Sequence, residues 1–183
     1  FEREQTGDRI RGIKRELGKQ GRPMGGAPVL GYTSQARRRR ELIHAGVDED
    51  QATAQAQTEF PRPKCLYVDE QEAQIVRMIF DLYVRKRMGS RHIAKELNRR
   101  GFRRRSGKQW VATQVGKRIN DPVVAGFIPF DEENYKRGRK PTTPKHKQTL
   151  YTALHQPIVN DKTWRRAQEI KRANTSDTFK VGN

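Results

Sequence analysis

The stretch from Ser90 to Trp110 reads SRHIAKELNRRGFRRRSGKQW and combines a short apolar pattern with eight Lys or Arg residues. Ile93, Ala94 and Leu97 recur at a spacing that places them on one face of a helix. Guanidinium groups match the geometry of phosphate oxygens and bind them through paired hydrogen bonds. The stretch therefore predicts a small helix that packs on a core and is followed by arginines that meet a phosphate-bearing partner.

A second short helix is expected near residues 112–120, after Gly101 and the basic connection. The two helices then form a helix-turn-helix-like pair, in which the N-terminal half of the second helix enters the major groove of DNA. Glutamine suits adenine, arginine and lysine suit guanine or phosphate, and threonine suits either. The candidate base-reading residues are Thr113, Gln114, Lys117 and Arg118. The candidate phosphate contacts are Arg91, Arg99, Arg100, Arg103, Arg104, Arg105 and Lys108.

The remaining reactive side chains predict neither catalysis nor metal binding within this chain. No serine has a His–carboxylate arrangement beside it, and His92, His146 and His155 lack a second ligand at metal spacing. Cys65 is the only cysteine, which excludes an internal disulfide and a paired-cysteine zinc site and fits a reducing cytosol. We expect Cys65 to be a small buried hydrophobe and Trp110 to be a core residue rather than a base-stacking one.

Charge is concentrated in one part of the sequence. The chain carries a formal net charge of +18, and residues 85–118 contain thirteen Lys or Arg against Glu96 alone. Such an excess indicates a polyanionic partner, the alternative being a solvated basic face. No apolar run approaches the ~18 residues of a membrane span, so no membrane association is expected.

The elements that position these residues are mostly helical. Ile10, Ile13 and Leu17 predict a helix at the start of the chain, and residues 34–59 predict a helical, solvated insertion. The arginine run 37–40 suits either phosphate or plain solvent exposure. The clearest helix is capped by Asp69, with Glu72 as its capping-box relative, and is ended by Gly89. Ser90 is expected to cap the next helix.

The C-terminal part predicts fewer regular elements. Phe127, Ile128 and Phe130 indicate a short strand, and residues 131–149 a mobile basic loop. Asn160 or Asp161 caps a last helix, which we expect to fray from about Asn174. The predicted fold is mainly α: a small helical domain with a helix-turn-helix-like DNA-binding unit and a few short strands.

Six stretches, in order, resemble the recombinase domain of the large serine recombinases, the phage integrases and transposon recombinases. They are GGAPVLGY (25–32), VDEQEAQIVRMIFDLY (68–83), SRHIAKELNRRGF (90–102), Trp110, VGKRINDPVVAG (115–126) and HQPIVNDKTWRRAQ (155–168). The opening FERE and DRIRGIKR resemble the end of the long helix that closes the catalytic domain. The sequence departs from the pattern of this family at three places. These are the long insertion at 34–64, Ala112 at a position where a helix cap would help, and the pair Asn120 and Val124.

The resemblance implies sequence-specific binding of double-stranded DNA at attachment sites, in a parent enzyme that cuts DNA with a serine in a domain preceding Phe1. It assigns residues 1–21 to the end of the catalytic-domain helix and the linker. It assigns residues 22–130 to the recombinase domain, with an insertion at 34–64. Residues 131–183 then lead toward a zinc-ribbon domain, so zinc is expected only downstream and no cofactor in this chain.

The resemblance also implies that the connector containing Arg22 tracks the minor groove. A dimer on each site, a tetramer in synapsis, and a bacterial or phage-encoded protein in the cytoplasm at the nucleoid are further expectations. Two other classes stay open from the residues alone: a helix-turn-helix transcription regulator and a ribosomal-type RNA-binding protein.

Overall fold

The computed structural model describes the chain except residues 1, 137–142 and 181–183. Helices dominate, as predicted. The α-helices are α1 (Glu2–Lys19), α2 (Gln35–His44), α3 (Glu49–Glu59), α4 (Glu70–Phe80), α5 (Ser90–Arg99), α6 (Ala112–Ile119), α7 (Glu132–Lys136) and α8 (Asp161–Lys180). The shorter elements are β1 (Tyr32–Thr33), β2 (Tyr67–Val68), η1 (Asp81–Arg85), η2 (Pro122–Ala125), β3 (Phe127–Phe130), η3 (Lys145–Lys147) and β4 (Thr149–Thr152).

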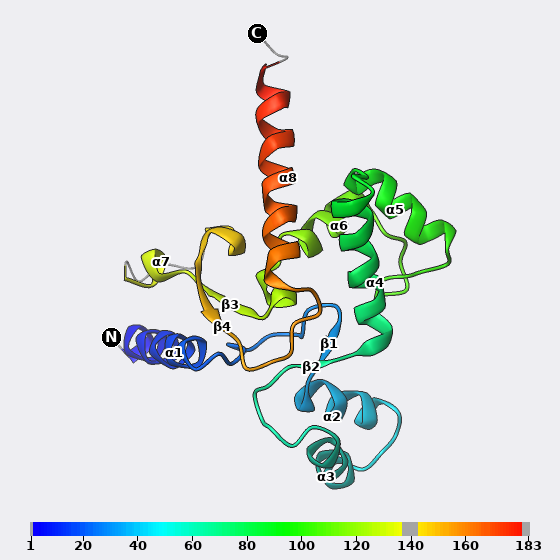
Figure 1. Cartoon of the computed structure of the whole chain (residues 1–183). Helices are drawn as coiled ribbons and strands as arrows, with labels where there is room; N and C mark the ends of the chain where they lie inside the picture. Colours follow the sequence, from blue (N-terminus) through cyan, green and yellow to red (C-terminus); the bar gives the residue numbers. More distant parts are fainter. Residues whose placement is uncertain (1, 137–142, 181–183) are drawn as a thin grey trace.

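Helix α8 rises from the middle of the molecule, with α1 on one side and α4, α5 and α6 on the other (Figure 1). The α2–α3 hairpin lies below them, beyond the antiparallel pair β1–β2, in which Tyr32 faces Val68. The strand predicted near Phe127 is β3, and it pairs antiparallel with β4. The small strand pairs therefore connect helical parts that are far apart in sequence.

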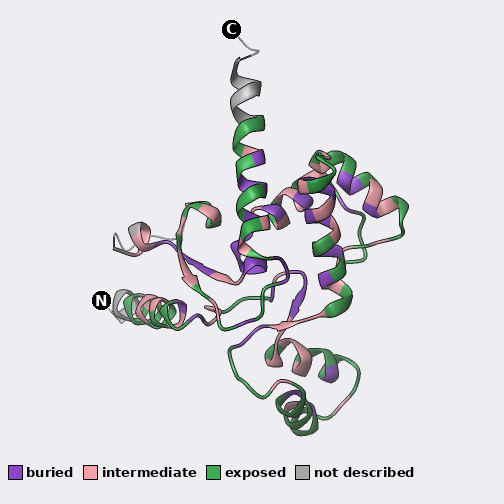
Figure 2. Ribbon diagram, viewed as in Figure 1, coloured by how far each residue is buried: buried purple, intermediate pink, exposed green. Residues whose placement is uncertain are grey.

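The core lies where α4, η1, α5, α6, η2 and the first half of α8 meet (Figure 2). Val76, Ile79 and Leu97 are fully buried there, as the helical spacing of apolar residues predicts. Trp110 is 4% exposed and Cys65 is buried, so both were predicted correctly as interior residues. The core fixes α6 against α5 and α4, and so fixes the direction of its polar face.

Helix α1 forms as predicted, but its apolar stripe does not pack on the core of this chain. Ile10 and Ile13 are 48% and 50% exposed, while Arg15 pairs with Glu132 of α7 and Gly18 lies beside Tyr151 of β4. Gly21 then takes a left-handed conformation, with φ of 69°, and its position lies against the backbone of residues 152–154. A side chain at this position would collide with the Thr152 carbonyl, so glycine is required where the connector leaves α1.

The insertion is a helical hairpin, and arginines of its 37–40 run pair with carboxylates of the same hairpin. Ser34 caps α2 by accepting a hydrogen bond from the Arg37 amide. Arg38 binds Glu59 of α3 at 2.7 Å, and Arg39 pairs with Glu49, also on α3. These arginines therefore link α2 to α3, which disfavours the interpretation that the run is a free phosphate site.

The end of the core helix differs from the prediction. Asp69 caps α4 as expected, but after Phe80 the helix widens into the π-turn η1, and Arg87 takes the left-handed conformation expected of a C-terminal glycine. Gly89 has an ordinary φ of −70° and itself occupies the N-cap of α5. Ser90 is the first helical residue and makes no capping hydrogen bond, so its predicted role was wrong.

The segment 131–149 is also more regular than the mobile loop that was predicted. Its described parts hold α7, η3 and the start of β4, while residues 137–142 lie outside the described residues. Asp131 anchors the segment by accepting hydrogen bonds from the Asn134 and Thr143 amides. Asn160 caps α8 through the Thr163 amide, and α8 continues to Lys180 beyond the predicted fraying point.

Candidate nucleic-acid interface

Helices α5 and α6 pack against one another, and Asn98 fixes the long connection between them. The Asn98 amide nitrogen donates to the Trp110 carbonyl at 2.9 Å, and the Trp110 amide donates back to Asn98 Oδ1 at 2.8 Å. Val111 then stands at the N-cap of α6 without a side-chain cap. The start of α6 at Ala112 is therefore set by the burial of Trp110 and by Asn98 rather than by a capping residue.

The predicted base-reading residues fall on two adjacent stripes of α6. Val115 and Ile119 are buried in the core. Thr113 and Lys117 are exposed, while Gln114 and Arg118 are half-buried and lie about 100° further round the helix. Because residues four apart share one face of a helix, each stripe presents two polar side chains to the same neighbour.

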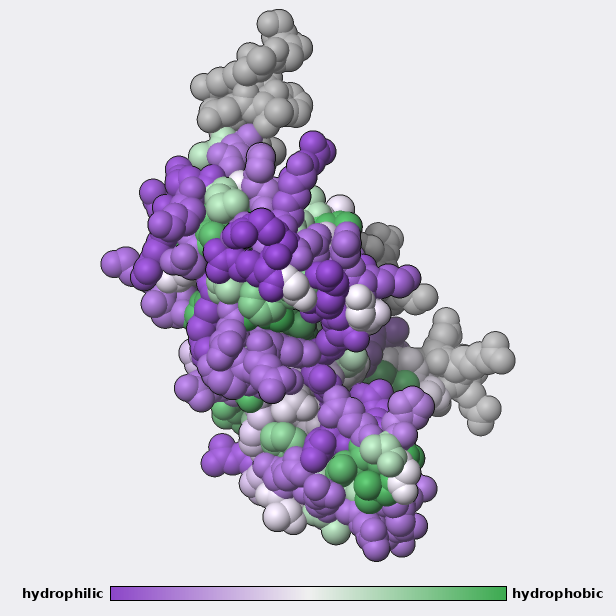
Figure 3. Space-filling model, turned by 90° about the vertical axis from the view of Figure 1, so that its right-hand side faces the viewer, coloured by the Kyte–Doolittle hydropathy of each residue, from purple (hydrophilic) through white to green (hydrophobic). Residues whose placement is uncertain are grey.

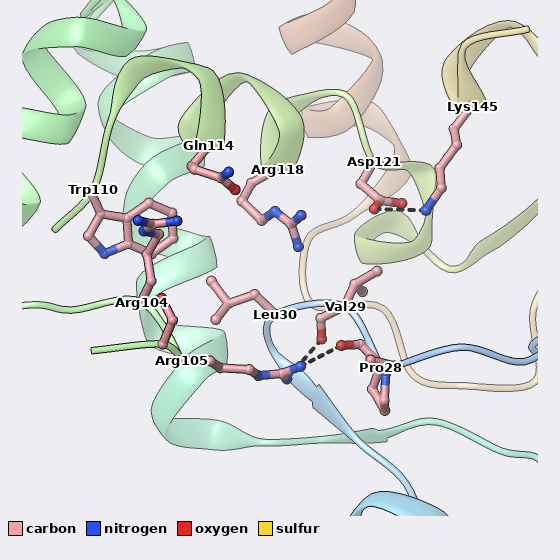
Figure 4. Close-up of a pocket in the computed structure, with 12 residues that line it drawn as sticks. Pro28, Val29, Leu30, Arg104, Arg105, Trp110, Gln114, Arg118, Asp121 and Lys145 are labelled. Atoms are coloured by element: carbon pink, nitrogen blue, oxygen red, sulfur yellow. Dashed lines mark hydrogen bonds and ion pairs between the residues drawn. The ribbon is translucent and has the colours of Figure 1, made fainter. Parts of the chain in front are cut away.

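Gln114 and Arg118 face a hollow that we call the α6 groove, with a volume of about 350 Å³. Helix α6 forms one wall, the connector residues 27–30 the opposite wall, and the 104–106 turn one end (Figure 4). Its lining residues are Ala27, Pro28, Val29, Leu30, Arg104, Arg105, Ser106, Trp110, Gln114, Arg118, Asp121 and Lys145. Two stretches about 80 residues apart thus converge on one polar depression.

Arg118 is the distinctive residue of the α6 groove. Its guanidinium points into the hollow (Figure 4) and makes no hydrogen bond to any residue that the structure describes. Burial lowers the pKa of Arg118, an effect that the nearby Asp121 carboxylate partly offsets by raising it. A half-buried cation without an acceptor is costly, so its arrangement favours an anionic or strongly accepting ligand in the groove.

Arg105 was predicted to contact phosphate, and the structure uses it inside the fold instead. Its guanidinium donates to the carbonyls of Pro28, Val29 and Tyr32, and to the Glu72 carboxylate. Burial raises the pKa of Glu72, but donors from Arg105 and the Gly31 amide hold that pKa below its ordinary value. Arg105 therefore ties the connector to α4 and forms the floor of the α6 groove (Figure 4).

Glu72 differs from its predicted role for the same reason. In a capping box it would accept from the backbone amide of Asp69. That amide instead donates to the Gly31 carbonyl, and Glu72 accepts from the Gly31 amide at 2.9 Å and from Arg105. Asp69 and Glu72 thus join β1 and the connector to the start of α4.

The other predicted phosphate contacts differ in whether their side chains are already bound to other residues of the chain. Arg99 and Arg100 both bind Glu96, whose pKa they lower to about 2. Arg103 donates to the Phe102 carbonyl, and Arg104 to the Gln109 carbonyl at 2.8 Å. In three further residues the backbone bonds within the fold, but the side chain makes no hydrogen bond or ion pair in the described part of the chain: Arg22, Arg91 and Lys108. The i, i+3 and i, i+4 spacing around Glu96 could have indicated its two ion pairs.

Two charged residues of the groove were not among the predicted sites. Asp121 is buried, accepts from the Val123 amide, and binds Lys145 with 3.3 Å between Oδ2 and Nζ. Lys145 lies in η3, within the segment predicted as a mobile loop. Asp121 stood in the sequence only as part of Asn120-Asp121-Pro122, a helix-ending signal, so nothing local indicated that it lies on the interface.

The surface surrounding these features is mostly hydrophilic. The face drawn in Figure 3 is covered chiefly by polar and charged side chains, with a small apolar patch on the lower body, where Figure 1 places the α2–α3 hairpin. Within the described residues, no group of three or more His, Cys, Asp or Glu could hold a metal ion. None of the helices in that part of the chain has the length and apolar character needed to cross a membrane.

A family model described as Recombinase matches residues 70–174, more than half of the chain. The chain belongs to the Recombinase family. This confirms the resemblance to the large serine recombinases that the motifs indicated. The matched segment of this Recombinase chain contains α4, α5, α6, the 100–111 connection and Lys145, and so most of the groove except its connector wall.

Two solved structures share the fold of this Recombinase chain. One is described as a crystal structure of an LSR–DNA complex: its TM-score is 0.58 at 17% identity, over 90% of this chain and 39% of that chain. The second concerns the sequence requirements of the Listeria innocua prophage attP site and has the same TM-score and identity, over 90% of this chain and 51% of that chain. The Recombinase chain thus spans at most about half of these proteins. No curated protein matches it.

Proposed function

We propose that this chain is a double-stranded DNA-binding domain of a site-specific serine recombinase, and that the α6 groove and the exposed stripe of α6 face the duplex. Gln114 and Arg118 contact base edges from the groove side, while Thr113 and Lys117 lie on the outer stripe. Arg22, Arg91, Arg103, Arg104 and Lys108 supply backbone contacts that position the domain. The similar solved structures include one described as a DNA complex, which supports this partner.

One observation carries the proposal: Arg118 projects into a polar groove with no acceptor among the described residues. Guanine O6 and N7 together accept a guanidinium in a bidentate geometry, which is the commonest specific contact in the major groove. The adjacent Gln114 offers the amide that suits adenine. The wider +12 charge of residues 85–118 explains affinity for any nucleic acid, whereas this pair supports selectivity.

The proposal is tested by selecting duplexes from a random pool and measuring fluorescence anisotropy across a salt series. We expect a recovered consensus with an affinity that falls steeply with salt, since released counterions drive binding. Salt-sensitive binding without a consensus would contradict sequence-specific recognition. Preference for structured RNA over duplex DNA would instead support the ribosomal-type alternative.

The parent activity follows from the same proposal. In a large serine recombinase the DNA is cut by a serine in a catalytic domain, so this domain would select the site on which that serine acts. The parent would act as a dimer on each site and as a tetramer in synapsis. Zinc would belong to a separate ribbon domain. A helix-turn-helix regulator would need no catalytic partner, so an adjoining serine nucleophile domain in the parent gene distinguishes the two.

Gly116→Ala is expected to raise stability and lower DNA affinity. A Cβ at position 116 meets nothing within 4 Å, so alanine should stabilise α6 by about 1 kcal/mol in the free chain. Position 116 borders the exposed stripe of Thr113 and Lys117, where the extra methyl group would crowd the duplex. Thermal unfolding and anisotropy measure the two effects.

Gly12→Ala is the matched control. Gly12 also lies in a helix with open space where a Cβ would stand, but that helix is α1, and Gly12 does not line the α6 groove. It should gain stability without changing affinity. If Gly116→Ala binds DNA as tightly as the wild type, the outer stripe of α6 does not approach the duplex.

A further inference from the structure

A second hollow, which we call the η3 cleft, lies beside the C-terminal end of α6. It has a volume of about 260 Å³. Its lining residues are Lys117, Arg118, Asn120, Asp121, Pro144, Lys145 and His146. Arg118, Asp121 and Lys145 also line the α6 groove, so the Lys145–Asp121 ion pair lies at the boundary between two adjacent hollows.

The η3 cleft is surrounded by cations from three elements. Lys117 and Arg118 of α6 and Lys145 of η3 line the cleft. Lys147 of η3 and Lys171 of α8 lie close enough to act on the lining residue His146, and the Lys171 ammonium donates to Asn120 Oδ1 at 2.9 Å. Asp121 is the only carboxylate among the lining residues, and Lys145 already neutralises it. The cleft therefore keeps a positive excess, which favours an anion.

His146 reports on the same electrostatic environment. Burial lowers its pKa, and the like charges of Lys171, Lys147 and Arg172 lower it further. The pKa of Lys171 is also lowered, by burial and then by Lys147. Bringing like charges close enough to lower the pKa values of His146 and Lys171 has a cost, and a bound anion would relieve this repulsion.

Resting on the proposed function, we propose that the η3 cleft binds a backbone phosphate of the same duplex whose base edges face Gln114 and Arg118. The two hollows share three lining residues, and α6 is only about 12 Å long, close to the width of the major groove that it would enter. The end of α6 therefore lies near a strand that borders the groove. The ligand chemistry is a phosphate oxyanion, which a phosphodiester supplies in DNA and inorganic phosphate supplies in solution.

The first test combines Lys147→Ala with duplexes in which single phosphates are replaced by neutral methylphosphonates. Lys147 lies in the cation cluster but outside the α6 groove, and Lys162→Ala on α8 removes the same charge away from both hollows. We expect Lys147→Ala to flatten the salt slope of binding by about one, with little change for Lys162→Ala. One methylphosphonate position should weaken wild-type binding and lose its effect in Lys147→Ala.

A second test uses pH, with His146→Asn as the variant. In the free chain the lowered pKa leaves His146 neutral near pH 7, and a nearby phosphate would raise that pKa, so binding takes up a proton. Wild-type affinity should rise as pH falls through the bound-state pKa and level off below the free-state pKa, while His146→Asn should lack this component. The charged groups facing His146 are Lys117, Arg118, Asp121, Lys145, Lys147, Lys171 and Arg172.

The outcomes separate this proposal from the proposed function. If the chain still binds its selected duplex through Arg118 but no methylphosphonate effect depends on Lys147, the η3 phosphate site alone is overturned. Another outcome is saturable binding of inorganic phosphate in calorimetry that Lys147→Ala abolishes. If DNA binding then shows no methylphosphonate effect that depends on Lys147, the cleft binds free phosphate and the assignment to DNA is overturned. Failure of the wild type to select any duplex would overturn the proposed function.

Discussion

Arg118→Ala is expected to remove most of the preference for a selected duplex over random DNA, a loss of about 1–3 kcal/mol, or roughly 5- to 150-fold. The alanine variant lacks the bidentate donor that faces the groove. Its fold should be at least as stable as the wild type, because the free chain loses a half-buried guanidinium without an acceptor in its described part. Anisotropy on both duplexes and thermal unfolding measure these opposite effects.

Two variants serve as controls for this result. Arg118→Lys keeps the charge but not the planar pair of donors, so it should retain affinity for random DNA and lose selectivity. Arg104→Ala should weaken selected and random duplexes about equally and flatten the salt dependence, since Arg104 is proposed to contact phosphate. If Arg118→Ala and Arg104→Ala act identically on both duplexes, Arg118 does not read a base.

Arg105→Ala is expected to lower the free energy of unfolding by about 3 kcal/mol, the largest stability effect among these variants. Substitution leaves Glu72, two connector carbonyls and the Tyr32 carbonyl of β1 without their shared donor. Freed from α4, the connector should no longer hold one wall of the α6 groove, so affinity for the selected duplex should also fall. The salt slope should stay unchanged, because Arg105 contacts the fold and not phosphate.

The pH dependence of stability checks the same interaction. The pKa of Glu72 lies below its ordinary 4.5, so its ion pair stabilises the folded chain above that pH and is lost as pH falls through the lowered value. This acid-sensitive component should be missing in Arg105→Ala. If Arg105→Ala instead keeps the stability of the wild type and flattens the salt slope of DNA binding by about one, Arg105 binds phosphate, as the sequence suggested.

Features that depend on neighbouring residues were predictable from the sequence. The apolar spacing of Ile93 and Leu97 placed α5, and Asp69 marked the start of α4. Trp110 was assigned to the core because a helix with a buried valine follows it. In each case the partners lie within about one or two helical turns, where periodicity and capping rules operate.

Features that depend on distant residues were not predictable in this way. The acceptors of Arg105 lie between 33 and 77 residues away, so a run of three arginines gave no sign that its last member belongs to the fold. Lys145 meets Asp121 across 24 residues. Gly89 failed as a helix stop because Leu82 and Tyr83 are buried in η1, and that packing continues the chain through a wider turn. Tertiary contacts decided these positions.

The most direct test of the α6 groove measures the affinity of the wild type and of Arg118→Ala for the selected duplex and for each single base-pair substitution of it. If Arg118 reads a base, the wild type discriminates at one or two adjacent base pairs, including a guanine, at which the variant is indifferent, while other positions keep their penalties in both proteins. An unchanged pattern of penalties in the variant would contradict base reading by Arg118 and place the base-reading surface elsewhere.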